Sequence, residues 1–162
     1  MDDNAPAPGA GLVVAPLADH PEHVDLVVDW NFRFWGPVTA RSHAGYVERV
    51  RGYLSRGPLP IVLVALADGK PAGTVSVNLD DMSTRPDLGP WVANLYVDPA
   101  FRGRGVGSAL VRAAEDAARA AGHARIFLYT PDQERMYTRL GWRVIDRDVY
   151  DGEDVAVMTK DL

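Results

Sequence analysis

Cysteine is absent from this chain of 162 residues. Disulfide bonds, thiolate metal ligands and a cysteine nucleophile are therefore excluded, and a reducing, cytoplasmic location is expected. The sequence also has no run of the roughly 20 apolar residues that a membrane-spanning helix needs. Its first residues are acidic and contain proline, unlike the basic and then apolar start of a secretory signal. We therefore expect no contact with a membrane.

An excess of positive charge is missing too, because the formal net charge is −5. General nucleic-acid binding needs a basic face, so nucleic acid is not expected as a partner. The four histidines show no spacing with other potential ligands that would suit a metal ion, and no metal site is predicted. They are His20, His23, His43 and His123.

The composition is that of an ordinary globular protein, with 47% hydrophobic and 24% charged residues. The length suits one domain, and no internal repeat or linker divides it. We expect a flexible N-terminal arm over residues 1–11 and a single domain over residues 12–162. Nothing in the sequence reveals a dimer interface, and a homodimer stays open.

Hydrophobic periodicity and turn residues predict alternating strands and helices. The expected strands are 12–17, 61–66, 72–79, a strand from Trp91, 125–130, and two more around the turn 151–154. The expected helices are 20–35, stopped by Gly36 and Pro37, then 42–55, 107–121 and 132–140. Such an order predicts a mixed α/β sheet with helices on both faces, in which the strands at 91 and 125 run parallel through a right-handed crossover.

The helix at 107–121 is predicted to be amphipathic. Its expected outer face includes Glu115 and Arg119, which are in the favourable i,i+4 order for an ion pair. Gly122 fits a left-handed cap at its end. The expected inner face consists of Leu110, Ala113, Ala117 and Ala121, and the rest of the outer face is Arg112 and Asp116.

A glycine- and arginine-rich loop separates the Trp91 strand from this helix. The first N–H groups of a helix lack internal partners and carry the positive end of its dipole, and glycines let a ligand come close to them. This pattern favours a phosphate or pyrophosphate. The dinucleotide fingerprint is not met, because Ser108 stands at its third glycine, and the P-loop lysine is missing. The pattern Arg/Gln-x-x-Gly-x-Gly/Ala is met by Arg102, Gly105 and Gly107.

With this loop, residues 61–160 resemble the GNAT superfamily of acyl-CoA-dependent N-acetyltransferases. The matching landmarks are Leu95-Tyr-Val-Asp-Pro before the loop, the alanine-rich helix after it, a strand that ends in Tyr129-Thr130, and Tyr137-Thr-Arg-Leu-Gly-Trp142. The resemblance implies six to seven strands, a splayed central parallel pair and about four helices. It also implies acetyl-CoA as co-substrate.

By position, the resemblance places the pyrophosphate of coenzyme A on the loop amides and the pantetheine arm along the Trp91 strand. The implied coenzyme-binding residues are Leu95, Tyr96, Val97, Arg102, Gly103, Arg104, Gly105, Val106, Gly107, Ser108 and Thr130. Thr130 stands where relatives often carry asparagine. A threonine hydroxyl can replace one of its hydrogen bonds, but coenzyme binding there is then weaker or differently arranged.

Acyl transfer to an amine needs a base for the ammonium proton and an acid for the departing thiolate. Tyr137 occupies the position at which the family keeps its leaving-group acid. Many relatives carry a glutamate where this chain has Trp91, so the base is not identified by position. Asp80 and Asp81 in the preceding loop are candidates, and an amine that arrives neutral is the alternative.

Four aromatic residues of 30–35 lie where the family builds its acceptor pocket. The predicted acceptor contacts are Trp30, Phe34, Trp35, Trp91 and Tyr150, which would suit a cationic amine. The sequence thus predicts transfer of an acetyl group to a primary amine of a small molecule or peptide. A protein N-terminal acetyltransferase and a non-catalytic acyl-CoA-binding module remain the alternatives.

Overall fold

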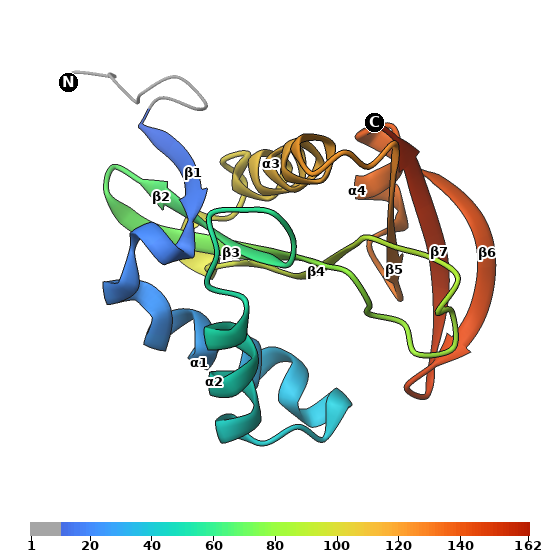
Figure 1. The fold of residues 1–162 in the computed structure, drawn as a ribbon, viewed down its shortest axis with the longest axis horizontal. Helices are drawn as coiled ribbons and strands as arrows, with labels where there is room; N and C mark the ends of the chain where they lie inside the picture. Colours follow the sequence, from blue (N-terminus) through green and yellow to red (C-terminus); the bar gives the residue numbers. More distant parts are fainter. Residues whose placement is uncertain (1–10) are drawn as a thin grey trace.

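The computed structural model describes residues 11–162, which form one mixed sheet with helices on both faces (Figure 1). The strand order is β1-β2-β3-β4-β5-β7-β6. All neighbouring strands are antiparallel except β4 and β5, which run parallel. The strands are β1 (Leu12–Pro16), β2 (Ile61–Ala67), β3 (Lys70–Asn78), β4 (Trp91–Val97), β5 (Arg125–Thr130), β6 (Arg143–Tyr150) and β7 (Glu153–Asp161). The predicted fold class is confirmed.

Two hydrophobic cores fill the spaces between the helices and the sheet. Helices α1 (Val24–Thr39) and α2 (His43–Gly52) cover one face, where Val27 and Tyr46 pack against Val64 of β2. Helices α3 (Val106–Ala120) and α4 (Glu134–Arg139) cover the other face, where Leu110 packs in one cluster with Tyr137. Figure 1 shows the two helix pairs on opposite sides of the strands. The sheet thus separates a face of α1 and α2 from a face of α3 and α4.

The expected arm, residues 1–11, lies outside the described residues except for Gly11. The carbonyl of Gly11 accepts a hydrogen bond from the N–H of Asp68, in the turn between β2 and β3. Gly11 is therefore attached to the sheet, and the strand β1 follows it directly.

Helix α1 differs from its predicted bounds at both ends. Two short 3-10 turns, Leu17–Asp19 and Pro21–His23, precede it, and it continues through Gly36 and Pro37 to Thr39. A proline near the end of a helix removes one hydrogen bond and leaves the rest of the last turn in place. Here the Thr39 hydroxyl donates to the carbonyl of Trp35 at 3.0 Å, and Ala40 ends the helix in the left-handed region.

Helix α3 buries a face rotated by one position from the predicted one. Val106, Leu110, Ala114 and Ala118 are buried with Val111, whereas Ala113 and Ala117 only border the core. The expected pair of Glu115 with Arg119 is wrong: Glu115 is buried and forms an ion pair with Lys160 of β7, while Arg119 pairs with Asp116. Gly122 has φ of +89°, as expected for a left-handed cap.

The parallel pair is splayed, as predicted. Only Trp91 and Phe127 pair in register between β4 and β5, after which the two strands separate. On its other side β4 remains paired with β3 up to Val97 opposite Gly73. The residues of β4 after Trp91 therefore have one edge without a neighbouring strand.

A β-bulge interrupts β4 within this open stretch. The register with β3 shifts between Thr74 and Ser76, and Asn94 takes a left-handed conformation with φ of +54°. The Asn94 side chain donates to the hydroxyl of Ser76 at 3.2 Å, which holds the bulge in place. Bulges re-aim the backbone of a strand, and they are common next to active sites.

Candidate active site

The loop before α3 has the geometry of an anion site. Gly103 and Gly105 have φ of +75° and +79°, and a Cβ at either position would meet no atom within 4 Å. The first backbone hydrogen bond of α3 runs from the N–H of Ala109 to the carbonyl of Gly105. The N–H groups of Val106, Gly107 and Ser108 therefore have no partner within the helix. With the open space beside Gly103 and Gly105, this helix start fits the diphosphate that the sequence predicts.

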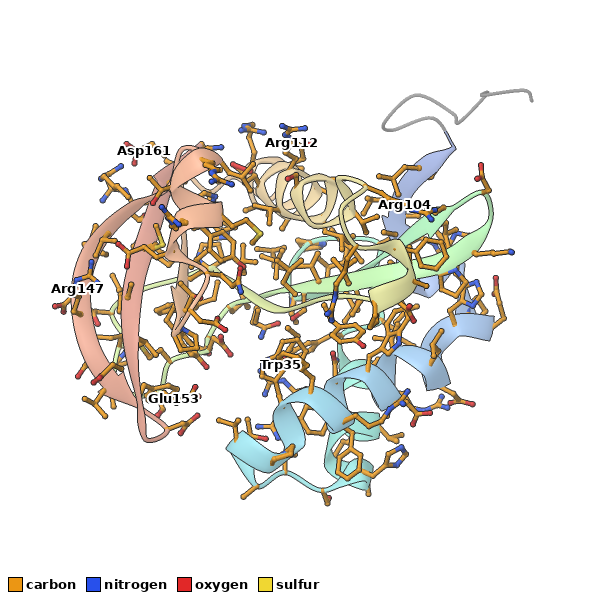
Figure 2. All side chains as sticks on the ribbon, turned by 180° about the vertical axis from the view of Figure 1, so that it is seen from behind. Trp35, Arg104, Arg112, Arg147, Glu153 and Asp161 are labelled. Carbon is orange, nitrogen blue, oxygen red and sulfur yellow. The ribbon has the colours of Figure 1, made fainter. Side chains whose placement is uncertain are left out.

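The two arginines of the loop already have local partners. Arg102 Nε donates to the carbonyl of Val97 at 3.1 Å, and the Arg104 guanidinium lies over the Phe101 ring at 5.7 Å. Figure 2 shows Arg104 beside the start of α3. The amides are thus the groups that stand ready for an anion, and the arginines add positive charge near them.

Leu95 and Val97 are half-buried in the core on the α3 face, on the open stretch of β4. Tyr96 points to the other face, where its ring contacts Trp30 at 5.4 Å and Phe34 at 5.7 Å. The predicted contact of Tyr96 with the coenzyme would therefore involve its backbone and not its side chain. Because Arg102 occupies the Val97 carbonyl, the N–H and C=O groups nearer the bulge are better placed for a pantetheine arm.

Tyr137 is buried on the α3 side of the sheet, with 6% of its surface exposed. Its ring packs edge-to-face on Trp142 at 5.9 Å, and it shares a core cluster with Val106 and Leu110 of α3. Burial, and then the charge of Asp132, raise the pKa of the Tyr137 hydroxyl. A tyrosine with a raised pKa stays protonated at neutral pH, which is the state that a proton donor needs.

Thr130 has a structural function in the turn between β5 and α4. Its hydroxyl oxygen accepts hydrogen bonds from the N–H groups of Gln133 at 2.9 Å and Asp132 at 3.4 Å. Its side chain is buried, so only its O–H remains to act as a donor. Of the Thr130 side chain, only this O–H group is left to replace the contact that an asparagine would make with the pantetheine arm.

Asp81 lies in a cavity of about 400 Å³ between α2 and the loop after β3. Burial raises the pKa of Asp81 to about 6, although the positive charge of Arg49, whose Nη2 is 3.8 Å from Asp81 Oδ1, opposes the shift. Asn78 also lowers this pKa, yet its amide is completely buried and makes no hydrogen bond of good geometry. Asp80 lines the same cavity but is exposed.

An aromatic row lies behind Asp81. The ring centroids of Trp91 and Tyr129 lie 6.2 Å apart, and those of Tyr129 and Tyr150 lie 5.1 Å apart. The Tyr150 hydroxyl lies 3.5 Å from the carbonyl of Asp81. Trp91 is completely buried and donates from Nε1 to the carbonyl of Leu88, so it supports the row from behind and offers no surface to an acceptor.

The sequence reasoning missed Tyr129 as a site residue. Burial, and then the charge of Asp81, raise the pKa of its hydroxyl. The two-residue alternation of β5 contained the signal: Ile126 and Leu128 belong to the core under α3, whereas Phe127 and Tyr129 belong to the cluster on the other face.

The bulge at Asn94 was missed for a different reason, because an asparagine within an apolar strand gave only a weak indication.

The predicted aromatic wall lies at the end of α1. Phe34 is 55% exposed, and its ring contacts Trp35 at 4.8 Å as well as Tyr96. Figure 2 shows Trp35 pointing from α1 toward β4, with Glu153 across from it at the tip of the β6–β7 hairpin. Trp30 is buried beneath these rings, so it shapes the wall without facing an acceptor.

Residues 11–162 contain no cluster of three metal-ligating side chains. Within the same range, no helix has the length and apolar character required to cross a bilayer.

Comparison with known proteins agrees with this geometry. Residues 24–142 match the sequence model of the acetyltransferase (GNAT) family. No curated protein sequence matches the chain. Similar solved structures include an acetyltransferase from Streptococcus agalactiae, which is 22% identical with a TM-score of 0.66 over 94% of this chain and 99% of that one.

Two further similar structures contain the coenzyme. An aminoglycoside 6′-N-acetyltransferase complexed with coenzyme A is 17% identical with a TM-score of 0.71, over 92% of this chain and 96% of that one. The protein yncA of Salmonella typhimurium with its cofactor acetyl-CoA is 18% identical with a TM-score of 0.70, over 94% of each chain. At these identities the likeness concerns the fold.

The fold, the loop before α3 and the family match together define an acyltransferase. The chain belongs to the GNAT acetyltransferase family.

Proposed function

We propose that the protein transfers the acetyl group of acetyl-CoA to a primary amine of a small molecule or peptide. The observation that carries this proposal is the open amide loop at the start of α3 beside the unpaired edge of β4. The loop would hold the diphosphate, and the β4 edge would hold the pantetheine arm as an added strand. Together they would direct a thioester into the gap between β4 and β5.

Transfer forms a C–N bond to the amine and breaks the C–S bond of the thioester. Tyr137 gives its proton to the departing sulfur and regains one from solvent. Asp81 takes the proton of the amine, directly or through water, and releases it to solvent. The pKa of Asp81, about 6, supports this assignment, because such a carboxylate is ionised at pH 7 and more basic than an ordinary aspartate. Asp80 is exposed to solvent, whereas Asp81 is enclosed.

The acceptor would approach from the face of α1 and α2. Phe34 and Trp35 offer aromatic faces there, and Asp81 with Tyr150 lines the other part of the approach. Aromatic and acidic groups favour a cationic amine. A protein N-terminus fits the same chemistry, so the panel of acceptors has to include peptides.

Release of free thiol from acetyl-CoA tests the proposal across polyamines, aminoglycosides, amino acids and peptide N-termini. The wild-type protein should release thiol with at least one class, and Gly107→Glu should abolish both release and calorimetric binding of acetyl-CoA. A Cβ at Gly107 meets only Val97 at 3.7 Å, so the variant should fold. Ala120→Glu, an equal charge change at the exposed end of α3, is the control. Binding without release for every amine would indicate the non-catalytic alternative.

A further inference from the structure

Lys160 on β7 contacts two successive helices of the chain, α3 and the end of α4. Its Nζ donates to the carbonyl of Leu140, just after α4, at 2.7 Å. The same ammonium forms an ion pair with the carboxylate of Glu115 on α3, whose side chain is only 5% exposed. The chain has one other lysine, Lys70, which is exposed at the start of β3. The chain thus places one of its two ammonium groups between α3, α4 and β7.

Helix α4 depends on outside contacts for its position. It spans six residues, Glu134–Arg139, and isolated helices of this length are unstable in water. The last carbonyls of a helix also lack internal partners, and the Leu140 carbonyl finds one in Lys160. Gly141 follows with φ of +92°, and a Cβ there would lie 3.5 Å from Lys160 Cε. The lysine side chain therefore runs directly over the end of α4.

The Glu115 carboxylate loses most of its hydration in this ion pair, whereas the Lys160 side chain stays 28% exposed, and placing a charge in a buried position is a costly way to hold a helix end. Apolar side chains of similar volume often stabilise a protein as well or better, so the pair indicates a requirement for exact placement. Helix α4 carries Tyr137, and the amide loop lies at the start of α3. Glu115 and Lys160 link these two elements through one contact point.

We propose that Glu115 and Lys160 are positioning residues that fix the Tyr137 hydroxyl relative to the coenzyme bound at the start of α3. The inference rests on the proposed function, in which Tyr137 is the proton donor. Neither residue touches the reacting atoms, so their removal should slow the chemical step and spare coenzyme affinity.

The experiment uses Glu115→Gln/Lys160→Met, which removes both charges together and avoids an unpaired buried carboxylate. We expect near-native near-UV circular dichroism and an acetyl-CoA Kd within about twofold of the wild type, with kcat lowered about tenfold or more. Hydrogen exchange should become faster in residues 131–142 and stay unchanged in α3. The single variant Lys160→Arg, which keeps the positive charge and both contacts, should retain most of the wild-type kcat. Lys70→Met is the matched control and should have no effect.

A double-mutant cycle with Tyr137→Phe separates this inference from the proposed function. In the Tyr137→Phe background, the Glu115→Gln/Lys160→Met change should cost less than about twofold, because there is no acid left to position. An equal loss in both backgrounds, or an undiminished kcat in the folded double variant, would overturn the inference alone. An undiminished kcat for Tyr137→Phe itself would overturn the acid assignment and the inference with it.

Discussion

The backbone N–H of Ser83 donates to the hydroxyl of Tyr150 at 3.1 Å, and the Ser83 hydroxyl lies 3.2 Å from the same oxygen. One phenol thus fastens the loop that carries Asp81 to the last hairpin of the chain, 67 residues later. Loops that position catalytic groups are usually held in this way by a rigid scaffold. The base candidate therefore depends on a contact across the acceptor side of the site.

Tyr150→Phe should release this loop while keeping the ring packed edge-to-face on Tyr129. We expect the free energy of unfolding to fall by about 1 kcal/mol, the usual net value of a lost hydrogen bond. The value of kcat/KM should fall severalfold, and acetyl-CoA affinity should not change, because the amide loop lies on the other face. Chemical denaturation, steady-state rates and calorimetry measure the three quantities. A loss of coenzyme affinity would contradict this separation.

Asp81 should define the acidic side of the pH–rate profile. It acts as a base only when ionised, so kcat/KM should rise with pH through about 6 and level off above it. Asp81→Asn should lower the rate about 100-fold or more and remove this limb. Asp80→Asn is the matched control and should keep the limb. A limb that persists in Asp81→Asn would assign it to another group.

The same carboxyl should reduce stability at neutral pH. Its pKa is raised in the folded state, so it contributes most to stability when protonated, at low pH. That contribution is lost as the pH rises from about 4 through 6. Asp81→Asn should therefore increase the free energy of unfolding at pH 7 by about 1–3 kcal/mol and have little effect at pH 4. Denaturation at the two pH values measures the difference, and a destabilised variant at pH 7 would contradict the burial of this charge.

Asn78 should keep the pKa of Asp81 lower than it would otherwise be. Its amide lowers the Asp81 pKa although both of its polar atoms lack a good hydrogen bond, and it is fully buried. Asn78→Leu should move the acidic limb to higher pH. The variant should retain or gain stability, because replacing an unsatisfied buried polar group by an apolar one removes a cost. A limb that stays in place would show that Asn78 does not act on Asp81.

Trp35→Ala should weaken acceptor binding in particular. A cation–π contact at a partly exposed site contributes about 1 kcal/mol, so KM for a cationic amine should rise about fivefold. The value of kcat and the affinity for acetyl-CoA should change little. Val38→Ala removes another exposed apolar side chain from the same helix and should leave KM unchanged. Equal KM values for Trp35→Ala and the wild type would remove the aromatic wall from the acceptor site.

Features set by short stretches of sequence could be predicted. The left-handed glycine at 122, the start of α3 and the parallel pairing of β4 with β5 all follow from local spacing and connection rules. The sequence also placed Tyr137 in the short helix after β5, although its burial against Trp142 required coordinates.

Features that depend on distant partners could not be predicted. Glu115 looked solvent-exposed because its partner, Lys160, lies on a strand at the other end of the chain. Trp30 and Trp91 were predicted as pocket residues from their positions in the family resemblance, and position alone does not distinguish a ring that faces a ligand from a buried one. The elevated pKa of Asp81 likewise arises from burial by α2 and the last hairpin, which no local pattern reveals.

The outer strand of the sheet, β6, has two exposed backbone donors near its hairpin already occupied. The hairpin closes at Tyr150 opposite Glu153, so the N–H groups of Arg147 and Val149 point away from β7. Each is bonded at 2.8 Å by the carboxylate of the preceding residue, Asp146 or Asp148. A second polypeptide could extend the sheet here only by displacing both carboxylates, against their negative charge. Fibril-like stacking and strand-exchanged pairing of copies are thus disfavoured at this margin, despite the exposed Ile145 and Val149 side chains.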